Sequence, residues 1–423
     1  MKVRYTYRLR PSATARAYLS REWGMCRYVW NQLVAESKAR YLADPDGTFG
    51  YKDQDKLLTS LRQTTVNEEG LAWLKEGSSV AQQQIVRDFS AARSKALLDR
   101  KNKVPMSKRR GLPKFKKRNV SLLSMNYTAR GFSLKPDADG HLRLVLPGGV
   151  NIPVIWSRDL PSTPKSVRVK QDSLGHWYAS FVVDVEHDSI PDVADDNAVG
   201  IDWGVTETAT TARVNLRTGE IDSGVRFDLR HSQHSKKASA ELARAQRKMA
   251  RRKRARGSEQ SHGYRLAKYQ AAKISKKVSR QRSDDAHKWA RSVARNHDHI
   301  AVEDFKPKFL AKTTMARKAA DAAIASVKSA LIWQATKAGR NLVLVNPSHT
   351  TTDCSNCGAR TKHRLPLGER TYSCESCGMV RPRDKNSAIV MIARAGFNPA
   401  GAEGTRPKSL LGFRLPESGI PRL

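Results

Sequence analysis

The stretch that decides the fold runs from residue 353 to residue 392 and reads D-C-S-N-C-G-A-R-T-K-H-R-L-P-L-G-E-R-T-Y-S-C-E-S-C-G-M-V-R-P-R-D-K-N-S-A-I-V-M-I. It contains two C-x-x-C-G turns, Cys354 with Cys357 and Cys374 with Cys377, at the spacing of a four-thiolate zinc ribbon. The glycine after each pair permits the positive φ with which backbone amides turn toward the sulfurs. Because so short a piece cannot bury a core of its own, we expect bound zinc to hold it together.

Two disulfides, or simply buried thiols, are the alternative explanation of these cysteines. No secretory signal peptide is evident, and cytosolic C-x-x-C pairs favour a metal. His349 and His363 could replace a thiolate, but four correctly spaced cysteines make them unnecessary. The fifth cysteine, Cys26, is expected to be a small buried apolar residue.

An acidic residue opens the helix expected after the ribbon. Asp384, Ala388 and Ile392 are spaced i, i+4 and i+8, so the acid shares a stripe with residues that should face a sheet. A solvated capping aspartate is the alternative.

The charge balance indicates the class of partner. With 77 Lys and Arg against 40 Asp and Glu, the 423 residues carry a formal net charge of +37. So large a surplus favours nucleic acid, with an anionic membrane as the alternative. No run of eighteen apolar residues is present, so we expect no transmembrane helix.

The first half is expected to be a β module that contains a helical insertion. Alternation predicts an opening strand that joins a barrel-like sheet formed further along the chain, and helical spacing predicts the insertion. The strand covers 2–9, the helices 13–42, 53–63 and 79–100, a basic loop 100–118, and the β-rich part 119–186.

Two places in this half suggest contact with nucleic acid. Three glutamines, 82–84, lie on one expected helix, and a Gln amide can pair with adenine, although solvent-facing positions are the alternative. Phe115, within G-L-P-K-F-K-K-R, could stack on a base; a nonspecific linker is the alternative.

The second half alternates strands and helices after a linker at 187–197. Asp202 interrupts a buried strand and therefore requires a ligand or partner. Residues 236–282 hold seventeen Lys or Arg and only two acids in a helix, turn, helix pattern suited to a phosphate backbone, with disorder until RNA binds as the alternative. A further strand carries Glu303 and Asp304 on opposite faces, so the pattern leaves open which one points inward. A helix at 319–339, a strand at 341–347 and a loose tail after Gly396 complete the expectation.

Three acids on separate elements of one α/β module suggest a shared task. If they converge, their mutual repulsion raises their pKa values unless divalent cations neutralise them. Two Mg²⁺ ions about 3.5–4 Å apart would activate water and stabilise the leaving oxygen of a phosphodiester.

The order of acid strand, basic helices, acid strand, ribbon and acid helix resembles the TnpB family of transposon-encoded RNA-guided nucleases, related to the compact type V CRISPR effectors. The resemblance covers most of the chain. It is carried by G-I-D-W-G (200–204), V-E-D-F (302–305), C-S-N-C-G, Y-S-C-E-S-C-G, R-D-K-N-S-A (383–388), G-L-P-K-F-K-K-R and Y-V-W-N.

The resemblance implies an α/β multidomain protein: an RNase H-like RuvC nuclease with a zinc ribbon insertion, preceded by a β-barrel wedge domain with a helical recognition insertion. The implied boundaries are a wedge strand 1–10, recognition helices 11–100, wedge barrel 101–190, RuvC 191–347 with a basic insertion 231–290, a ribbon 348–381 that binds target nucleic acid, a final RuvC helix 382–396 and a flexible tail 397–423.

The implied site follows the matching motifs. Asp202, Glu303 and Asp384 become catalytic ligands of two Mg²⁺ ions, and the four ribbon cysteines become zinc ligands. Contacts with guide RNA or target DNA are expected at Gln83, which matches a position facing a short motif beside the target, and at Lys114, Phe115, Lys116, Arg247, Lys248, Arg251, Arg252 and Arg254. Two departures are Pro382, where the family has an acid, and Trp203, where an aliphatic residue is usual.

The resemblance thus implies an RNA-guided DNA endonuclease of the prokaryotic cytoplasm and nucleoid, acting as a monomer or a dimer. An RNA-guided repressor that binds DNA without cutting is one alternative, and Pro382 is its support. A zinc-ribbon protein that binds RNA or the ribosome, with structural acids, is another.

Overall fold

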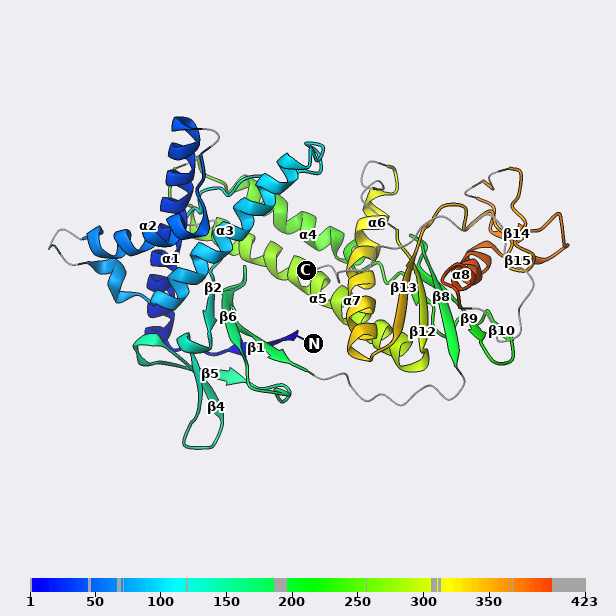
Figure 1. Ribbon diagram of the computed structural model, residues 1–423, viewed down its shortest axis with the longest axis horizontal. Coiled ribbons are helices and arrows are strands. Elements are labelled where there is room, and N and C mark those ends of the chain that lie inside the picture. The colour runs from blue at the N-terminus through cyan, green and yellow to red at the C-terminus, as the bar shows by residue number, and fades with distance from the viewer. Residues whose placement is uncertain are drawn as a thin grey trace. The chain divides into compact units, whose positions relative to one another are not determined.

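The computed structural model describes residues 2–44, 47–66, 70, 72–118, 121–185, 196–255, 257–305, 310, 313–363, 365–366 and 368–397. The chain divides into two units, residues 1–186 and 187–423 (Figure 1). Residues 187–195 of the expected linker at 187–197, and the tail after 397, lie outside the described residues. No helix in the described part of the chain has both the length and the apolar character needed to cross a bilayer.

The first unit contains a seven-stranded antiparallel sheet, in the place of the expected barrel-like sheet. The opening strand pairs with β5 and β7, which confirms that it joins this sheet. The order is β2-β6-β7-β1-β5-β4-β3. The strands are β1 (Lys2–Leu9), β2 (Ser124–Thr128), β3 (Ser133–Pro136), β4 (Leu142–Leu146), β5 (Val150–Ile155), β6 (Ser166–Gln171) and β7 (Trp177–Asp184).

Three long helices fill the insertion after β1, as the sequence predicts. They are α1 (Ala13–Ala43), α2 (Tyr51–Thr64) and α3 (Ser79–Lys101), with a short 3₁₀ turn at Trp73–Glu76. Ser12 and Ser78 cap α1 and α3 by accepting backbone N–H groups in the first turn. Cys26 is fully buried in the core that α1 shares with the sheet, as expected.

The solvent-facing alternative for the glutamines of α3 is wrong for two of them. Gln82 is fully buried, where it donates to the carbonyl of Leu74 at 2.9 Å and accepts from Arg62. Gln84 is also buried and accepts from Asn126. Burial requires these amides to find partners inside the protein, which a count of glutamines in the sequence does not reveal.

The second unit is built on a mixed sheet of order β10-β9-β8-β12-β13, with β11 paired to β9. Strands β8 and β12 run parallel, as do β12 and β13, whereas β9 is antiparallel to β8. The strands are β8 (Asn197–Trp203), β9 (Glu207–Asn215), β10 (Ile221–Asp222), β11 (Leu229–Arg230), β12 (His299–Glu303) and β13 (Asn341–Val345).

Helices cover both faces of this sheet because its central strands are apolar on both sides. One face packs with α5 (His262–Asn296) and α7 (Ile324–Lys337) through Val199, Ile201, Trp203, Ile300 and Val302. The other face packs with α8 (Arg383–Arg394) through Ala198, Ala212, Val214 and Ala301. Figure 1 shows α7 and α8 on either side of the strands.

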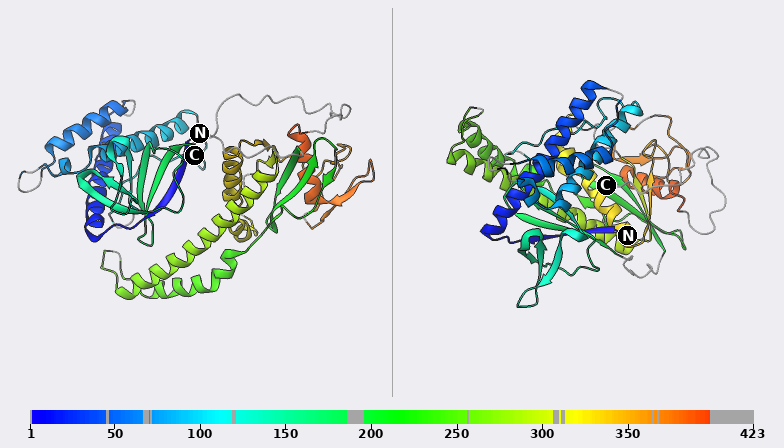
Figure 2. Two further views of the ribbon diagram at one scale, coloured as in Figure 1. Left: turned by 90° about the horizontal axis from the view of Figure 1, so that it is seen from below. Right: turned by 60° about the vertical axis from the view of Figure 1, so that its left-hand side comes forward.

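The basic region 236–282 forms the predicted helix, turn, helix. Helices α4 (His234–Arg251) and α5 pack against each other and extend away from the sheet (Figure 2). The single helix predicted at 319–339 is instead two helices, α6 (Ala316–Ala322) and α7, because Ala323 between them adopts a left-handed φ of 52°. No glycine or proline marks this break, so the helical periodicity concealed it.

Candidate metal centres

The four ribbon cysteines meet in space. Their sulfurs all lie within 4.8 Å of one another, with 3.8 Å between Cys354 and Cys377 and 3.6 Å between Cys357 and Cys374. These separations are far longer than the ~2.05 Å of a disulfide bond, and all four thiols are free. The disulfide alternative is therefore wrong for these four residues.

The cluster has the dimensions of a zinc site. Zinc–sulfur bonds of about 2.3 Å in a tetrahedron place neighbouring sulfurs roughly 3.8 Å apart. Gly358 and Gly378 adopt φ values of 73° and 70°, as the C-x-x-C-G turns require. The pKa of Cys377 falls to about 6 because the N–H of Met379 and then the amide of Asn356 donate to its sulfur. The residues present thus fit a four-thiolate zinc ion.

Two carboxylates lie at the carboxyl ends of neighbouring parallel strands. In β8 and β12, Ile201 pairs with Val302, so Asp202 and Glu303 are the next residues on adjacent strands. Side chains alternate along a strand, and Ile201 and Val302 face α5 and α7. Asp202 and Glu303 consequently face the side that α8 covers, and Asp384 lies in the first turn of α8.

The structure separates Glu303 from Asp304, which the sequence pattern left open. Glu303 is 7% exposed, whereas Asp304 pairs with Lys328 of α7 at 2.5 Å. Trp203 holds Glu303 in place, since its indole N–H donates to the Glu303 carbonyl at 3.1 Å and its backbone N–H to the carboxylate at 3.4 Å. The indole itself packs edge-on against Trp289.

The electrostatics of this site disfavour charge on the carboxylates when no cation is bound. Burial raises the pKa of Asp202 well above its usual range, and the charges of Glu303 and Asp384 raise it further. Burial also raises the pKa of Glu303 to about 7, although the N–H of Trp203 and the charge of Lys328 both act to lower it. Divalent cations would remove this penalty, and carboxylate oxygens are the ligands that Mg²⁺ prefers.

The third acid is more open. Asp384 is 38% exposed and faces Arg383 at 3.6 Å and Arg370 at 3.7 Å. The three carboxylates do not come within the 4.8 Å that joins the cysteine sulfurs. Ligands of a two-ion site need not be so close, because bonds of about 2.1 Å extend from ions about 3.5–4 Å apart. The donor set therefore fits Mg²⁺.

Several residues that build the site escaped sequence reasoning. A Cβ on Gly200 would meet the carbonyl oxygen of Ala388 at 1.8 Å, so only glycine lets α8 pack this close to β8. Lys385 is buried beside Asp384 and donates to Asp228 at 2.8 Å and to the carbonyl of Thr211. Amphipathic spacing alone predicts an exposed side chain for this lysine. Its place in the R-D-K-N-S-A segment, among residues of the buried side of the helix, was the signal that could have revealed its burial.

Pro382 occupies the position where an acid was expected. It is the last residue of β15 (Val380–Pro382), which pairs with β14 (Thr371–Ser373). It also stands at the N-cap position of α8, without a side-chain capping hydrogen bond, and is exposed. Its ring supplies no charge to the site, whereas its fixed φ suits the residue that opens a helix.

The predicted nucleic-acid contacts differ in what already surrounds them. Gln83 is half-buried, and Phe115 is 48% exposed with the Lys38 ammonium 4.7 Å from its ring centroid. Lys114 is exposed, whereas the ammonium of Lys116 lies 3.8 Å from the Trp30 ring centroid. Exposed side chains also include Arg247, Lys248, Arg251, Arg252 and Arg254, at the far end of α4 and just after it.

Comparison with known proteins defines the class first. Residues 180–314 match the family described as probable transposase, 325–391 the Cas12f1-like TNB domain, and 1–44 a helix-turn-helix domain. In the structure, 2–44 hold β1 and one continuous helix, α1. The fold is similar to that in a Cas12f1–sgRNA–target DNA complex, at a TM-score of 0.50 and 13% identity over 92% of this chain and 98% of that one. The chain is thus an α/β multidomain protein whose fold resembles that of Cas12f1.

Two relatives that match nearly end to end define the family. The chain is 30% identical to a putative RNA-guided DNA endonuclease of Streptomyces pristinaespiralis over 96% of its own length and 93% of that protein. It is 25% identical to the putative RNA-guided DNA endonuclease InsQ of Escherichia coli (strain K12), over 92% and 91%. The chain belongs to the TnpB family, as its motifs had suggested.

Proposed function

We propose that this protein is an RNA-guided DNA endonuclease that cleaves target DNA beside a short flanking motif. The observation that carries the proposal is the placement of Asp202 and Glu303 at the ends of adjacent parallel strands, on the face where α8 presents Asp384. The near end-to-end similarity to putative RNA-guided DNA endonucleases supports it.

Asp202, Glu303 and Asp384 would hold two Mg²⁺ ions in a RuvC-type site. Bound there, the ions would supply a nucleophilic water at neutral pH and neutralise charge on the leaving oxygen. The chain itself orients the ligands: Trp203 fixes Glu303 by two hydrogen bonds, and the Lys385–Asp228 pair anchors the first turn of α8. The buried setting of Glu303 keeps bulk water from competing for the same oxygens.

The basic elements would hold guide RNA and DNA. In this assignment the wedge comprises 1–10 and 101–190, the recognition helices 11–100, the nuclease 191–347 with 382–396, and the ribbon 348–381. Arginine and lysine side chains after residue 246 are exposed and suit a phosphate backbone. Base pairing between guide and target would read the sequence, and Gln83 on α3 would help to read the flanking duplex.

Neither alternative is favoured by an observation. Pro382 was the support for a repressor that does not cut, yet it only occupies the N-cap position of α8, and Asp202, Glu303 and Asp384 are all present. A purely structural role for these acids is disfavoured because burial raises the pKa values of Asp202 and Glu303 despite the nearby charges of Arg383 and Lys328.

The test is plasmid cleavage by the purified complex of the protein with its own copurified RNA. We expect Mg²⁺-dependent cuts in a plasmid that carries the matching target next to one flanking motif of a randomised library. A plasmid left intact across the whole library, with target binding retained, would support the repressor instead.

A further inference from the structure

Both ends of α8 are tied to the zinc ribbon by side chains that have no part in binding metal. Asn386 is fully buried in the second half of the first turn, two residues beyond Asp384. Its amide N–H donates to the carbonyl of Asp353 at 2.8 Å, and its amide oxygen accepts the N–H of Ser355 at 2.9 Å. These two backbone groups lie on either side of Cys354, so one side chain binds the first C-x-x-C turn both before and after its first cysteine.

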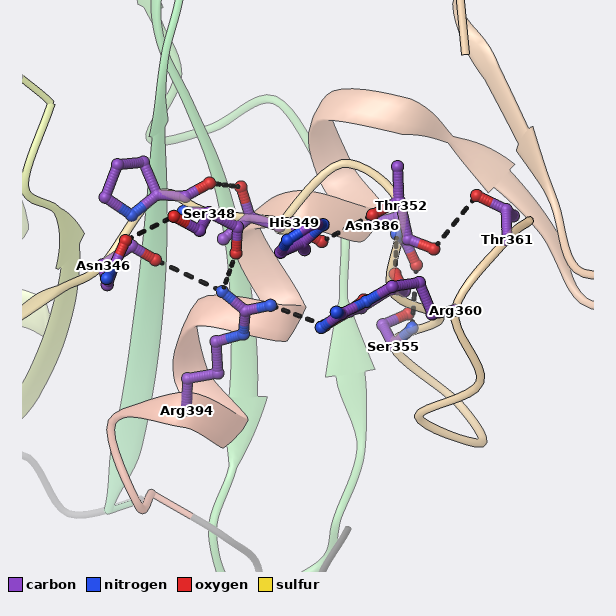
Figure 3. A network of polar contacts seen from close by, with 12 residues as sticks. Asn346, Ser348, His349, Thr352, Ser355, Arg360, Thr361, Asn386 and Arg394 are labelled. Carbon is purple, nitrogen blue, oxygen red and sulfur yellow. Dashed lines mark hydrogen bonds and ion pairs between the residues drawn. The ribbon is translucent and has the colours of Figure 1, made fainter. Parts of the chain in front are cut away.

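The far end of α8 makes a second tie. Arg394 donates to the Asp353 carboxylate at 2.5 Å and to the carbonyls of Ser348 and Asn346 at 2.6 and 3.2 Å. Arg360 of the ribbon binds the same carboxylate from another side, at 2.6 Å. Figure 3 shows Arg394 and Asn386 reaching from α8 toward the segment that leads into the first C-x-x-C turn. The helix is therefore held to the ribbon at two points about two turns apart.

The partners of Asn386 lie on either side of a metal ligand, so bound metal would add to the hydrogen bonds that position them. The peptide groups on either side of Cys354 belong to a turn that is too small to be fixed by an apolar core, since the buried apolar cluster here comprises Cys354, Tyr372 and Cys374. Metal bound to Cys354 would lock this turn and keep both groups aimed at Asn386. Without the metal, these partners would be held by hydrogen bonds alone, and any loss of contact would leave the buried Asn386 amide unpaired.

We propose that Asn386 is a positioning residue through which occupancy of the cysteine site sets the affinity of the carboxylate site for its cations. The inference rests on the proposed function, because it assigns metal binding to Asp384. The two sites are coupled through the first turn of α8, and by linkage each ion favours binding of the other. Lys385 holds one side of that turn through Asp228, and Asn386 holds the side next to the ribbon.

The test measures Mn²⁺ binding, by electron paramagnetic resonance, to the protein–RNA complex without DNA. Asn386→Ala should retain one zinc per chain but raise the Mn²⁺ dissociation constant at least fivefold. Chelating zinc from the unsubstituted protein should raise it by a similar factor, and chelating it from Asn386→Ala should add little. Asn341→Ala, the same change on the exposed edge strand β13, should alter neither quantity.

A second measurement guards against a general loss of structure. Hydrogen exchange should accelerate at 383–388 in Asn386→Ala and stay unchanged in the strands β8 and β12. Cleavage should recover at saturating Mg²⁺, which a merely unfolded variant would not do. If the alanine variant does not fold, Asn386→Ser, which keeps a neutral hydroxyl beside these backbone groups, should show a smaller rise of about twofold in the Mn²⁺ constant.

The outcomes separate the two proposals. An unsubstituted complex that lacks any Mn²⁺ site sensitive to Glu303→Gln would overturn the proposed function, and this inference with it. A Glu303-dependent site whose affinity is the same in Asn386→Ala would overturn the inference alone. The inference would also be overturned if removing zinc from Asn386→Ala raised the Mn²⁺ dissociation constant as much as it does in the unsubstituted protein. The coupling would then run through other residues.

Discussion

The two metal centres of this chain differ in how far the protein alone has assembled them. In the ribbon, four sulfurs lie within 4.8 Å, and hydrogen bonds lower the pKa of Cys377 to about 6. In the carboxylate site, burial raises the pKa values of Asp202 and Glu303, and the charges of Glu303 and Asp384 raise that of Asp202 further. Asp384 also forms ion pairs with Arg370 and Arg383. The two centres therefore differ in geometry: the sulfurs already lie at the spacing of a bound ion, whereas one of the three carboxylates still faces arginines.

The largest expected effect comes from removing a carboxylate. Glu303→Gln preserves size and burial but removes the charge that would hold Mg²⁺, so we expect cleavage to fall about 10³-fold or more, ~4 kcal/mol in the barrier. Target binding should persist. Single-turnover cleavage and DNA binding should be measured together. Asp304→Asn, the neighbouring acid that pairs with Lys328, is the matched control and should lose less than about tenfold.

Removing a thiolate tests the ribbon in the same way. Cys374→Ser should lower zinc from about one ion per chain to almost none and make residues 348–381 sensitive to protease, because the metal supplies most of the folding free energy there. We expect cleavage to fall by roughly tenfold or more through the loosened first turn of α8. Zinc by mass spectrometry and limited proteolysis are the measurements. Cys26→Ala, a buried cysteine of the other unit, should keep its zinc; retention of zinc by Cys374→Ser would refute the four-thiolate site.

The contrast between the two centres also marks what sequence reasoning could reach. The cysteine spacing, the acid order and most helix bounds were predictable, because ligand spacing and hydrophobic periodicity are local. Gly200, Asp228 and the contacts of Asn386 were not. Gly200 and Asp228 contact residues more than a hundred positions away, and Asn386 contacts backbone groups. Such contacts produce no periodic pattern in the sequence. The choice of Glu303 over Asp304 came from family resemblance, and its support lies in the burial of Glu303 and the ion pair of Asp304.

The third prediction concerns pH. A Glu303 pKa raised from 4.5 to about 7 means that the folded, cation-free protein binds more protons than the unfolded chain between these values. Its stability should therefore fall as pH rises through that window, by roughly 3 kcal/mol for this group. Mg²⁺ binds the deprotonated form, so the stabilisation by Mg²⁺ should grow as pH rises.

Thermal unfolding at pH 5 to 8, with and without saturating Mg²⁺, measures this effect. Glu303→Gln should make both curves less steep, since it removes one of the two buried carboxyl groups whose pKa values are raised and leaves Asp202. A Mg²⁺ stabilisation that is the same at pH 5.5 and pH 8 would contradict the raised pKa.

The smallest expected effect concerns the arginine that links the two centres. Arg370, on the ribbon, lies 3.7 Å from Asp384 and is 58% exposed, so the pair contributes at most about 1 kcal/mol. Its guanidinium competes with cations for the Asp384 carboxylate. Arg370→Gln should therefore lower the Mg²⁺ concentration for half-maximal cleavage by about two- to threefold, with zinc content unchanged.

A titration of cleavage rate against Mg²⁺ decides between competition and support. Lys362→Gln removes an exposed ribbon cation of equal charge and controls for weaker DNA binding, which would lower the maximal rate without moving the midpoint. A higher Mg²⁺ requirement in Arg370→Gln would mean that the arginine orients Asp384 instead of competing for it. The ribbon would then assist the carboxylate site through a charge as well as through Asn386, and the two centres would be less distinct than their ligand geometry suggests.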